Sequence, residues 1–337
     1  MSHEPLLVKD LGEHGLLEKL QRFCPPGVVG DDGAVINTHP HRSLVVTTDV
    51  LVEEVHFSDR TTAAFDIGWR ATAANLSDLA AMGATPLGIT VGLSLPGEKL
   101  VSWVEEVYQG IDACLKTYQT SLVGGDLCRS PVASLAITAF GEVTPERAIR
   151  RSCARPGDAI VITGLHGLAR GGLELLLAPS KGSSLTPAER SQLIEAHQRP
   201  KPRLDVLPYL AKIPQTIAIA GMDSSDGLAD AVRQICCGSG VGAVIDLSRL
   251  TIFPGLVKLA GDKTAWEWMF YGGEDFELVL CLTHHFASNL VKELGENAVV
   301  IGEITANEKI KLVNSQNYST ADILNLNLNL NKGFQHF

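Results

Sequence analysis

The chain has 337 residues, of which 45% are hydrophobic and 20% charged, and its formal net charge is −10 at pH 7. This balance is typical of a folded globular protein, and a chain of this length is expected to form two domains. The negative charge argues against nucleic acid as a partner, because such binding needs a basic surface.

The sequence also predicts the compartment. No apolar run approaches the roughly 18 residues that would cross a bilayer, and the first residues, MSHEPLLVKD, lack a basic segment followed by a long apolar one. The seven cysteines include no Cys-x-x-Cys pair, which disfavours a disulfide framework and a zinc site. We therefore expect a cytoplasmic protein that does not bind membranes.

Strands and helices are expected to alternate in the first half of the chain. Residues 44–50 predict a buried strand that ends in polar residues, and a helix is expected from an N-cap at Asp66 to about Met82. A strand follows at 87–95. Residues 98–118 have the clearest helical pattern, because their apolar side chains recur every three or four positions.

The second half is expected to continue this alternation. It begins with a strand at 159–164 and a helix at 168–177, and residues 228–237 predict another helix. Between them we expect a polar connector at about 179–188 and an extended link at 197–205. Both halves therefore predict an α/β (α+β) fold with two layers.

A domain boundary is expected near the middle of the chain. The segment 144–157 is polar, rich in Arg and closed by Pro-Gly, which is typical of a linker. We place the first domain at 1–147 and the second at 148–337. The tail at 324–331 alternates Leu and Asn, and we expect a surface strand or loop there.

Short acidic loops are the most informative feature of the sequence. They are GDDGAV (30–35), TTD (47–49), NLSD (75–78), GGD (124–126), DSSDG (223–227), GGED (272–275) and, more weakly, VEEVHF (52–57). Acids repel one another and are costly to bury, so their accumulation at turn-like positions favours a shared cation. Oxygen ligands suit Mg²⁺, which in enzymes usually bridges phosphate groups. The loops therefore predict an enzyme of nucleotide phosphates.

Position strengthens three of these motifs. TTD follows an apolar β run, and strand ends are where α/β folds place ligands. The paired glycines of GGD let the backbone approach a phosphate or a metal closely. DSSDG precedes a predicted helix, whose free N–H groups attract phosphate.

Each motif also has an ordinary structural interpretation. An Asp-Gly pair is commonly a turn, and Asp78 could face solvent or bond to the backbone. Asn75, one turn earlier, lies on the same helix face. Other phosphate motifs are absent, since GDKT (261–264) lacks the glycine spacing of a P-loop and GSGVG (238–242) is better explained as a turn. The joint occurrence of the acidic loops, rather than any one of them, favours a common site.

The motif set resembles the thiamine-monophosphate kinase family, within the superfamily of aminoimidazole ribotide synthetase-like ATP enzymes. The matching strings are GDDGAV, TTDVLVEEVHF, NLSDLAAMGATP, LVGGD, RPGDAIVITG, SSDGL, GGEDFELVL and GFQHF, in family order between residues 30 and 337. Ser224 and Phe276 depart mildly from the family pattern without removing a ligand. The resemblance implies conversion of thiamine monophosphate to thiamine diphosphate with ATP and several Mg²⁺ ions.

The resemblance also implies roles for individual residues. It implies metal ligands at Asp32, Thr47, Thr48, Asp49, Asp78, Asp126, Asp223 and Asp226. It implies ATP contacts from Gly125, Asp126, Arg151 and Ser225, and contacts to thiamine monophosphate from His56, Glu274 and Phe334. Arg151 could instead be a solvated charge and Glu274 a surface acid, while His56 and Phe334 could be structural.

Family members further imply a homodimer in which the N-terminal sheets form a β-barrel-like core and a C-terminal α/β domain completes the active site. The acceptor phosphate has a second pKa near ~6 and is already an anionic nucleophile at neutral pH. No general base is therefore needed, and we expect direct in-line transfer between two polyanions screened by Mg²⁺.

Three other functions remain open on the same scaffold. One is ATP-dependent activation of an amide oxygen, as in purine-biosynthetic relatives. Selenophosphate synthetase and the hydrogenase-maturation dehydratase form a second class, disfavoured because no cysteine precedes Cys24 or follows Cys281. The third is a nucleotide-binding regulatory subunit, against which the intact acidic loops argue.

Overall fold

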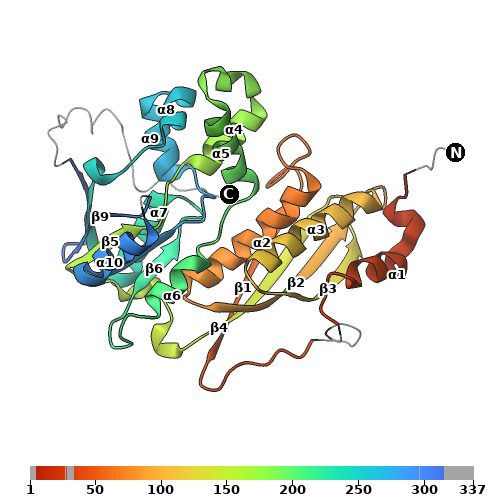
Figure 1. Ribbon diagram of the computed structural model, residues 1–337, viewed down its shortest axis with the longest axis horizontal. Helices are drawn as coiled ribbons and strands as arrows, with labels where there is room; N and C mark the ends of the chain where they lie inside the picture. Colours follow the sequence, from red (N-terminus) through yellow and green to blue (C-terminus); the bar gives the residue numbers. More distant parts are fainter. Residues whose placement is uncertain (1–4, 27, 29–33, 296, 315–337) are drawn as a thin grey trace. The chain divides into compact units, whose positions relative to one another are not determined.

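The computed structural model describes residues 5–26, 28, 34–295 and 297–314. The chain separates into two compact units (Figure 1). Unit 1 comprises Met1–Leu79 and Thr85–Glu142, and unit 2 comprises Ala80–Ala84 and Val143–Phe337. Asp32, Phe334 and the Leu-Asn tail, all of which carried predictions, lie outside the described residues.

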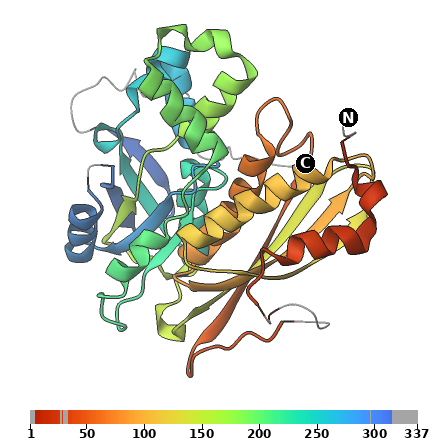
Figure 2. The same cartoon turned by 45° about the vertical axis from the view of Figure 1, so that its right-hand side comes forward.

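Unit 1 is built on a four-stranded sheet with the strand order β1-β4-β2-β3. The strands are β1 (Ser43–Val52), β2 (Thr85–Leu95), β3 (Leu122–Arg129) and β4 (Ser134–Val143), and the helices are α1 (Val8–Gln21), α2 (Ala64–Ala81) and α3 (Val101–Thr117). Strand β2 runs parallel to β3 and antiparallel to β4. Helices α2 and α3 lie across one face of the sheet (Figure 2).

Helices α2 and α3 approach each other through glycine. A Cβ atom at Gly68 would lie 1.9 Å from the carbonyl oxygen of Val107, and one at Gly110 would lie 1.8 Å from that of Phe65. The two backbones are therefore in direct contact, which any larger side chain would prevent.

The strand expected at 44–50 is present, but the prediction that it is buried is wrong, because none of these residues is buried. Leu44, Val46 and Val50 are about half exposed, at 52%, 53% and 49%, whereas Leu51 is buried. Successive side chains of a strand point to opposite faces, and helices cover only one face of this sheet (Figure 2). The other face of β1 therefore presents aliphatic side chains at the edge of the sheet.

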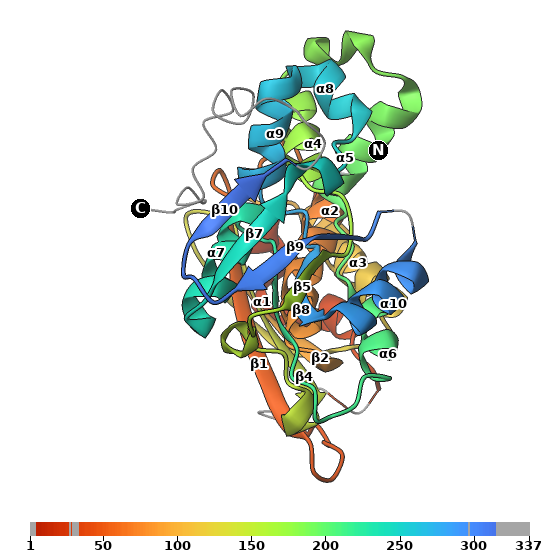
Figure 3. The same cartoon turned by 90° about the vertical axis from the view of Figure 1, so that its left-hand side faces the viewer.

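Unit 2 is built on a six-stranded mixed sheet with the order β10-β7-β9-β5-β8-β6 (Figure 3). Its strands are β5 (Asp158–Ile162), β6 (Ala220–Asp223), β7 (Gly242–Asp246), β8 (Leu278–Thr283), β9 (Val299–Thr305) and β10 (Ile310–Val313). Strands β10 and β7 are parallel, and every other neighbouring pair is antiparallel.

Helices cover both faces of the unit 2 sheet. The helices of unit 2 are α4 (Leu168–Leu177), α5 (Pro187–Gln198), α6 (Leu207–Leu210), α7 (Leu228–Ser239), α8 (Pro254–Ala260), α9 (Asp262–Tyr271) and α10 (His284–Leu294). Ile160 of β5 belongs to a core that includes α7 and α9, whereas its neighbour Val161 belongs to a core that includes α6 and α10. Strand β5 is buried along its whole length for this reason.

The expected connector at 179–188 and link at 197–205 are partly helical. A 3₁₀ segment spans Pro179–Ser184, and α5 begins at Pro187 and continues to Gln198. Thr186 caps α5, because its side chain accepts from the Glu189 amide while the Glu189 carboxylate accepts from the Thr186 amide. Helix α2 begins at Ala64, so Asp66 lies in its first turn and is not the N-cap.

No helix within the described ranges is both long and apolar enough to cross a membrane.

Candidate active site

Strand β1 and helix α2 form a polar cluster in unit 1. The Thr47 hydroxyl donates to the Asp78 carboxylate, and the backbone N–H of Asp49 donates to the side-chain oxygen of Asn75 at 3.1 Å. Asn75 is fully buried, and its side-chain nitrogen donates to the Ala71 carbonyl at 3.0 Å. Three predicted ligands, Thr47, Asp49 and Asp78, thus lie together on the helix-covered face.

Two other predicted ligands of unit 1 lie on the open face of the sheet. The hydroxyls of Thr48 and Thr138 are 2.9 Å apart. Asp126 on β3 is paired with Gly92 on β2, beside the register pair of Thr90 and Thr138. Thr48 and Asp126 are both exposed. Alternation along each strand therefore separates Thr48 from its neighbours Thr47 and Asp49, and Asp126 from Gly125.

The loop after β1 holds His56 in a defined orientation. The Val52 amide donates to Nδ1 of His56 at 3.1 Å, and the His56 amide donates to the Val52 carbonyl at 2.8 Å. A neutral His56 ring must then carry its proton on Nε2, which is the nitrogen suited to donate to an anion. Glu53 ties the loop to the turn before α3 through a 2.6 Å ion pair with Lys99.

In unit 2, the DSSDG motif links β6 to α7. Asp223 is the last residue of β6 and is 3% exposed. Its carboxylate accepts from the Ser225 hydroxyl at 3.1 Å, and the Ser224 carbonyl accepts from the Gly227 amide at 3.0 Å. The loop therefore places Asp223 and Ser225 side by side just before the first turn of α7.

The GGED motif lies against DSSDG. The Glu274 amide donates to the Ser225 carbonyl at 2.7 Å, and a Cβ atom at Gly273 would lie 2.6 Å from that oxygen. Glu274 and Phe276 adopt left-handed backbone conformations, with φ of 60° and 52°. Such angles are uncommon for residues other than glycine and persist only where the surroundings enforce them.

Two partly buried acids, Asp275 and Glu277, fasten the GGED segment on either side of Phe276. Asp275 accepts from the amides of Gly167 (2.6 Å) and Ala169 (2.8 Å) at the start of α4. Glu277 accepts from Arg203 Nη1 at 2.5 Å and from the Thr163 hydroxyl at 2.6 Å. These contacts anchor the segment to α4 and to the chain that follows α5.

Burial governs the protonation of these acids. It raises the pKa of Asp275 to about 7, because the two backbone amides only partly offset the loss of hydration. Burial also raises the pKa of Glu277, although the charge of Arg203 opposes that shift. Burial by itself would lower the pKa of Arg203. The hydrogen bonds to Asp205 and the charge of Glu277 outweigh this effect, so the pKa of Arg203 is raised.

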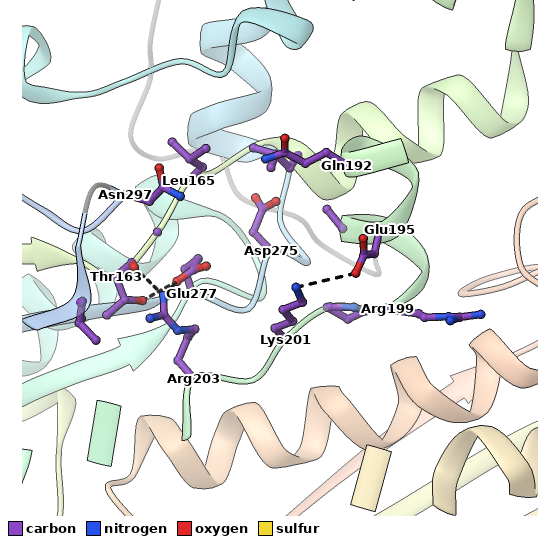
Figure 4. Close-up of a pocket in the computed structure, with 15 residues that line it drawn as sticks. Thr163, Leu165, Gln192, Glu195, Arg199, Lys201, Arg203, Asp275, Glu277 and Asn297 are labelled. Carbon is purple, nitrogen blue, oxygen red and sulfur yellow. Dashed lines mark hydrogen bonds and ion pairs between the residues drawn. The ribbon is translucent and has the colours of Figure 1, made fainter. Parts of the chain in front are cut away.

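A cavity of about 320 Å³ opens beside the two acids (Figure 4). Asp275, Glu277 and Arg203 line it, and Lys201 reaches Glu195 across it at 3.8 Å. The lining mixes both signs of charge with Leu side chains, so it selects no single class of ligand. This cavity was not predicted from the sequence. The signal available was the repeated cation of RPKPR (199–203) and the three acids of EDFE (274–277).

Arg151 lies in a 3₁₀ turn, Arg151–Cys153. Its guanidinium donates to the side-chain oxygen of Gln234 on α7. Gln234 in turn donates to Asp230, which forms a 2.6 Å ion pair with Arg233. Arg151 is exposed, so this network orients its charge without burying it.

Comparisons with known proteins identify the family. Profiles for the N-terminal and C-terminal domains of AIR synthase related proteins match residues 30–143 and 155–314. The thiamine-monophosphate kinase of Synechococcus elongatus is 52% identical over 98% of both chains. That of Salmonella typhimurium is 37% identical over 82% of this chain and 80% of its own. The chain belongs to the thiamine-monophosphate kinase family.

Solved structures agree with this membership of the thiamine-monophosphate kinase family. The crystal structure of the Stenotrophomonas maltophilia K279a kinase has a TM-score of 0.77 at 34% identity, covering 88% of this chain and 95% of its own. AaThiL complexed with AMPPCP and TMP has a TM-score of 0.72 at 30% identity, covering 98% of both chains. The hydrogenase maturation protein HypE from E. coli, at 18% identity and a TM-score of 0.73, shares the fold. The family resemblance and the two-domain α/β fold expected from the sequence are confirmed.

The side chains in this family member fit Mg²⁺ by their chemistry. Thr47, Asp49 and Asp78 offer hydroxyl and carboxylate oxygens, and Asp223 offers another carboxylate, which are ligands that Mg²⁺ prefers. Within the described ranges, no three His, Cys, Asp or Glu side chains form a group that could hold a metal ion. The metal, ATP and substrate contacts of individual residues therefore stay predictions.

Proposed function

We propose that this protein transfers a phosphoryl group from ATP to thiamine monophosphate and so produces thiamine diphosphate. The observation that carries the proposal is the 52% identity to the Synechococcus elongatus kinase over 98% of both chains. AaThiL, 30% identical over the same share of both chains, is complexed with AMPPCP and TMP. The side-chain chemistry of both units is compatible with this reaction.

The metal and substrate assignments are part of the proposal. Thr47, Asp49 and Asp78 would hold Mg²⁺ on the helix-covered face of the unit 1 sheet. Thr48 and Asp126 would be Mg²⁺ ligands on the open face, and Asp32, Asp223 and Asp226 would be further ligands. Bound Mg²⁺ would screen the charge between two phosphate chains and align the attacking and leaving oxygens. Gly125, Arg151 and Ser225 would contact ATP. His56, Glu274 and Phe334 would contact thiamine monophosphate.

The protein's own groups bind and orient the two anions in this proposal. His56 would present its Nε2 proton to an oxygen of the acceptor phosphate, because Nδ1 already accepts from Val52. Arg151, held by Gln234, would place a positive charge near the ATP phosphates. The acceptor needs no general base, since its phosphate is largely ionised at neutral pH. Transfer is then direct and in line, with inversion at the transferred phosphorus.

A homodimer is a further part of the proposal. The half-exposed aliphatic side chains of β1, Leu44, Val46 and Val50, lie on the face of the sheet that α2 and α3 do not cover. Apolar side chains gathered on one strand face favour burial against another surface. We place a second copy there, so that the two unit 1 sheets make a β-barrel-like core.

The division of labour and the location complete the proposal. Residues 1–147 would bind ATP and Mg²⁺ and form the dimer, and 148–337 would complete the active site. The seven cysteines are free thiols, which fits a cytoplasmic, reducing compartment.

The test is turnover by the purified protein. Incubation with ATP, Mg²⁺ and thiamine monophosphate should yield equal amounts of ADP and thiamine diphosphate, and Asp49→Asn should abolish both. Asp112→Asn is the matched control, because Asp112 lies on α3 and forms an ion pair with Lys116 on the same helix. ATP binding without turnover would favour the regulatory subunit, and ATP consumption only with an amide substrate would favour the purine-type reaction.

A further inference from the structure

The conformation of Glu274 is held from both sides. Its own amide donates to the Ser225 carbonyl at 2.7 Å, and the carboxylate of the next residue, Asp275, accepts two backbone N–H bonds from the start of α4. Between these anchors the backbone of Glu274 is left-handed, with φ of 60°. A non-glycine residue leaves this region when it can, because its Cβ crowds the following carbonyl.

The carboxylate of Asp275 anchors the GGED segment to the start of α4. Each carboxylate oxygen accepts one amide, Oδ2 from Gly167 at 2.6 Å and Oδ1 from Ala169 at 2.8 Å. Gly167, which immediately precedes α4, is itself left-handed, with φ of 87°. Both oxygens are needed, since a side chain with a single acceptor could satisfy only one of the two amides.

The contacts of Glu277 fix the other end of the same segment. Glu277 is held by Arg203 and Thr163, and Phe276 between the two acids is also left-handed, with φ of 52°. Release of Glu277 would therefore disturb the cavity wall and the sheet, whereas release of Asp275 would act first on Glu274, its direct neighbour.

We infer that Asp275 is a positioning residue for the reaction. By accepting hydrogen bonds from the first amides of α4, it holds Glu274 in the left-handed conformation that fixes the direction of the Glu274 side chain. This inference rests on the proposed contact between Glu274 and thiamine monophosphate. Loss of these two hydrogen bonds lets Glu274 relax toward ordinary backbone angles, which turns its carboxylate away from the substrate. The Asp275 side chain itself does not touch the substrate.

The experiment compares Asp275→Asn with Glu274→Ala and with the double variant. Asn keeps the size of Asp275 but replaces one acceptor with a donor. The KM for thiamine monophosphate should rise on the order of tenfold or more in each single variant, because small displacements of an orienting group have effects of this size. The KM for ATP and the Mg²⁺ requirement should change little. The double variant should be no worse than Glu274→Ala, because a misdirected carboxylate and an absent one are equivalent.

Asp158→Asn is the matched control. Asp158 is buried and, like Asp275, accepts from a backbone amide, that of Arg155 at 2.8 Å, but it lies at the start of β5. It should lower the melting temperature without moving the KM for thiamine monophosphate. Asp275→Ser, which keeps one acceptor, is the second variant should Asp275→Asn not fold, and its circular dichroism spectrum must match that of the wild type.

The outcomes separate the two proposals. A normal KM for thiamine monophosphate in Glu274→Ala would overturn the role of Glu274 and with it this part of the proposed function. If Glu274→Ala raises that KM but the effect of Asp275→Asn multiplies with it, Asp275 is only structural and the inference alone is overturned. A rise in KM shared by thiamine monophosphate and ATP in Asp275→Asn would overturn it as well.

Discussion

The backbone N–H of Asp49 donates to the side-chain oxygen of Asn75 at 3.1 Å and so joins strand β1 to helix α2. Asn75 is fully buried, and its nitrogen is used by the Ala71 carbonyl of its own helix. One helical turn further on, Asp78 accepts from the Thr47 hydroxyl. Asn75 therefore sets where β1 lies along α2, and thereby which oxygens of the two elements face one another.

The first prediction concerns this bond. Asn75→Leu keeps the volume but leaves the Asp49 amide without its acceptor, which should cost about 1–3 kcal/mol of folding free energy. The proposed Mg²⁺ ligands would also lose their alignment, so the Mg²⁺ concentration for half-maximal rate should rise several-fold in kinetic titrations. Thr72→Val is the control, since the hydroxyl of buried Thr72 donates to the Gly68 carbonyl within the same helix. Equal Mg²⁺ dependence in both variants would contradict the prediction.

The sequence was sufficient to place the NLSD motif on a helix and TTD on a strand. The helical periodicity around Asp78 and the apolar run before Thr47 are local signals, and both elements exist in the structure. Strict alternation along a strand also implies that Thr48 faces away from Thr47 and Asp49. That step was open to the sequence analysis, which instead treated the three side chains as one convergent group.

The missed features depend on long-range contacts or on a local signal that was overlooked. Nothing within GGED predicts a left-handed Glu274, because the conformation is enforced by Ser225 and by the start of α4, which are distant in sequence. Helix α5 differs, since Thr186 and Glu189 form a capping box that the sequence displays. The polar composition around it suggested a connector and obscured that signal.

The second prediction tests the dimer. Val46→Asp places a charge on the open face of β1, where Val46 is 53% exposed, so it should not disturb the core of unit 1. Light scattering should then give half the wild-type mass, because a buried charge at the interface is costly. Leu177→Asp, on α4 and 40% exposed, should leave the mass unchanged. A wild-type mass equal to that of one chain would refute the dimer.

The third prediction uses the backbone of Glu274. Glu274→Gly and Glu274→Ala both remove the carboxylate, but only glycine adopts a φ of 60° without steric cost. In urea unfolding, the Gly variant should be more stable than the Ala variant by about 1 kcal/mol. The same pair of substitutions at Glu267, inside α9, should show the opposite order by a similar amount, because glycine weakens helices. If the Ala variant is more stable than the Gly variant at both positions, the backbone of Glu274 carries no strain.

The fourth prediction concerns His166, which is 1% exposed. Its Nδ1 lies 3.1 Å from the Gly164 carbonyl, and its Nε2 has no hydrogen-bond partner within the described part of the chain. Burial lowers its pKa from 6.5 to about 4, although the Gly164 carbonyl partly opposes the shift. The unfolded chain therefore binds this proton more readily than the folded one between pH 6.5 and 4.

The stability that neutral His166 provides is present above pH 6.5 and is lost as the pH falls toward 4. The unfolding free energy of the wild type minus that of His166→Gln should therefore fall by about 3 kcal/mol between pH 7 and pH 4. Taking the difference removes the opposite contribution of Asp275, whose raised pKa is common to both proteins. Urea titrations of both proteins at four or five pH values measure this difference in unfolding free energy. A difference that does not change with pH would mean that His166 is hydrated or already charged in the folded state.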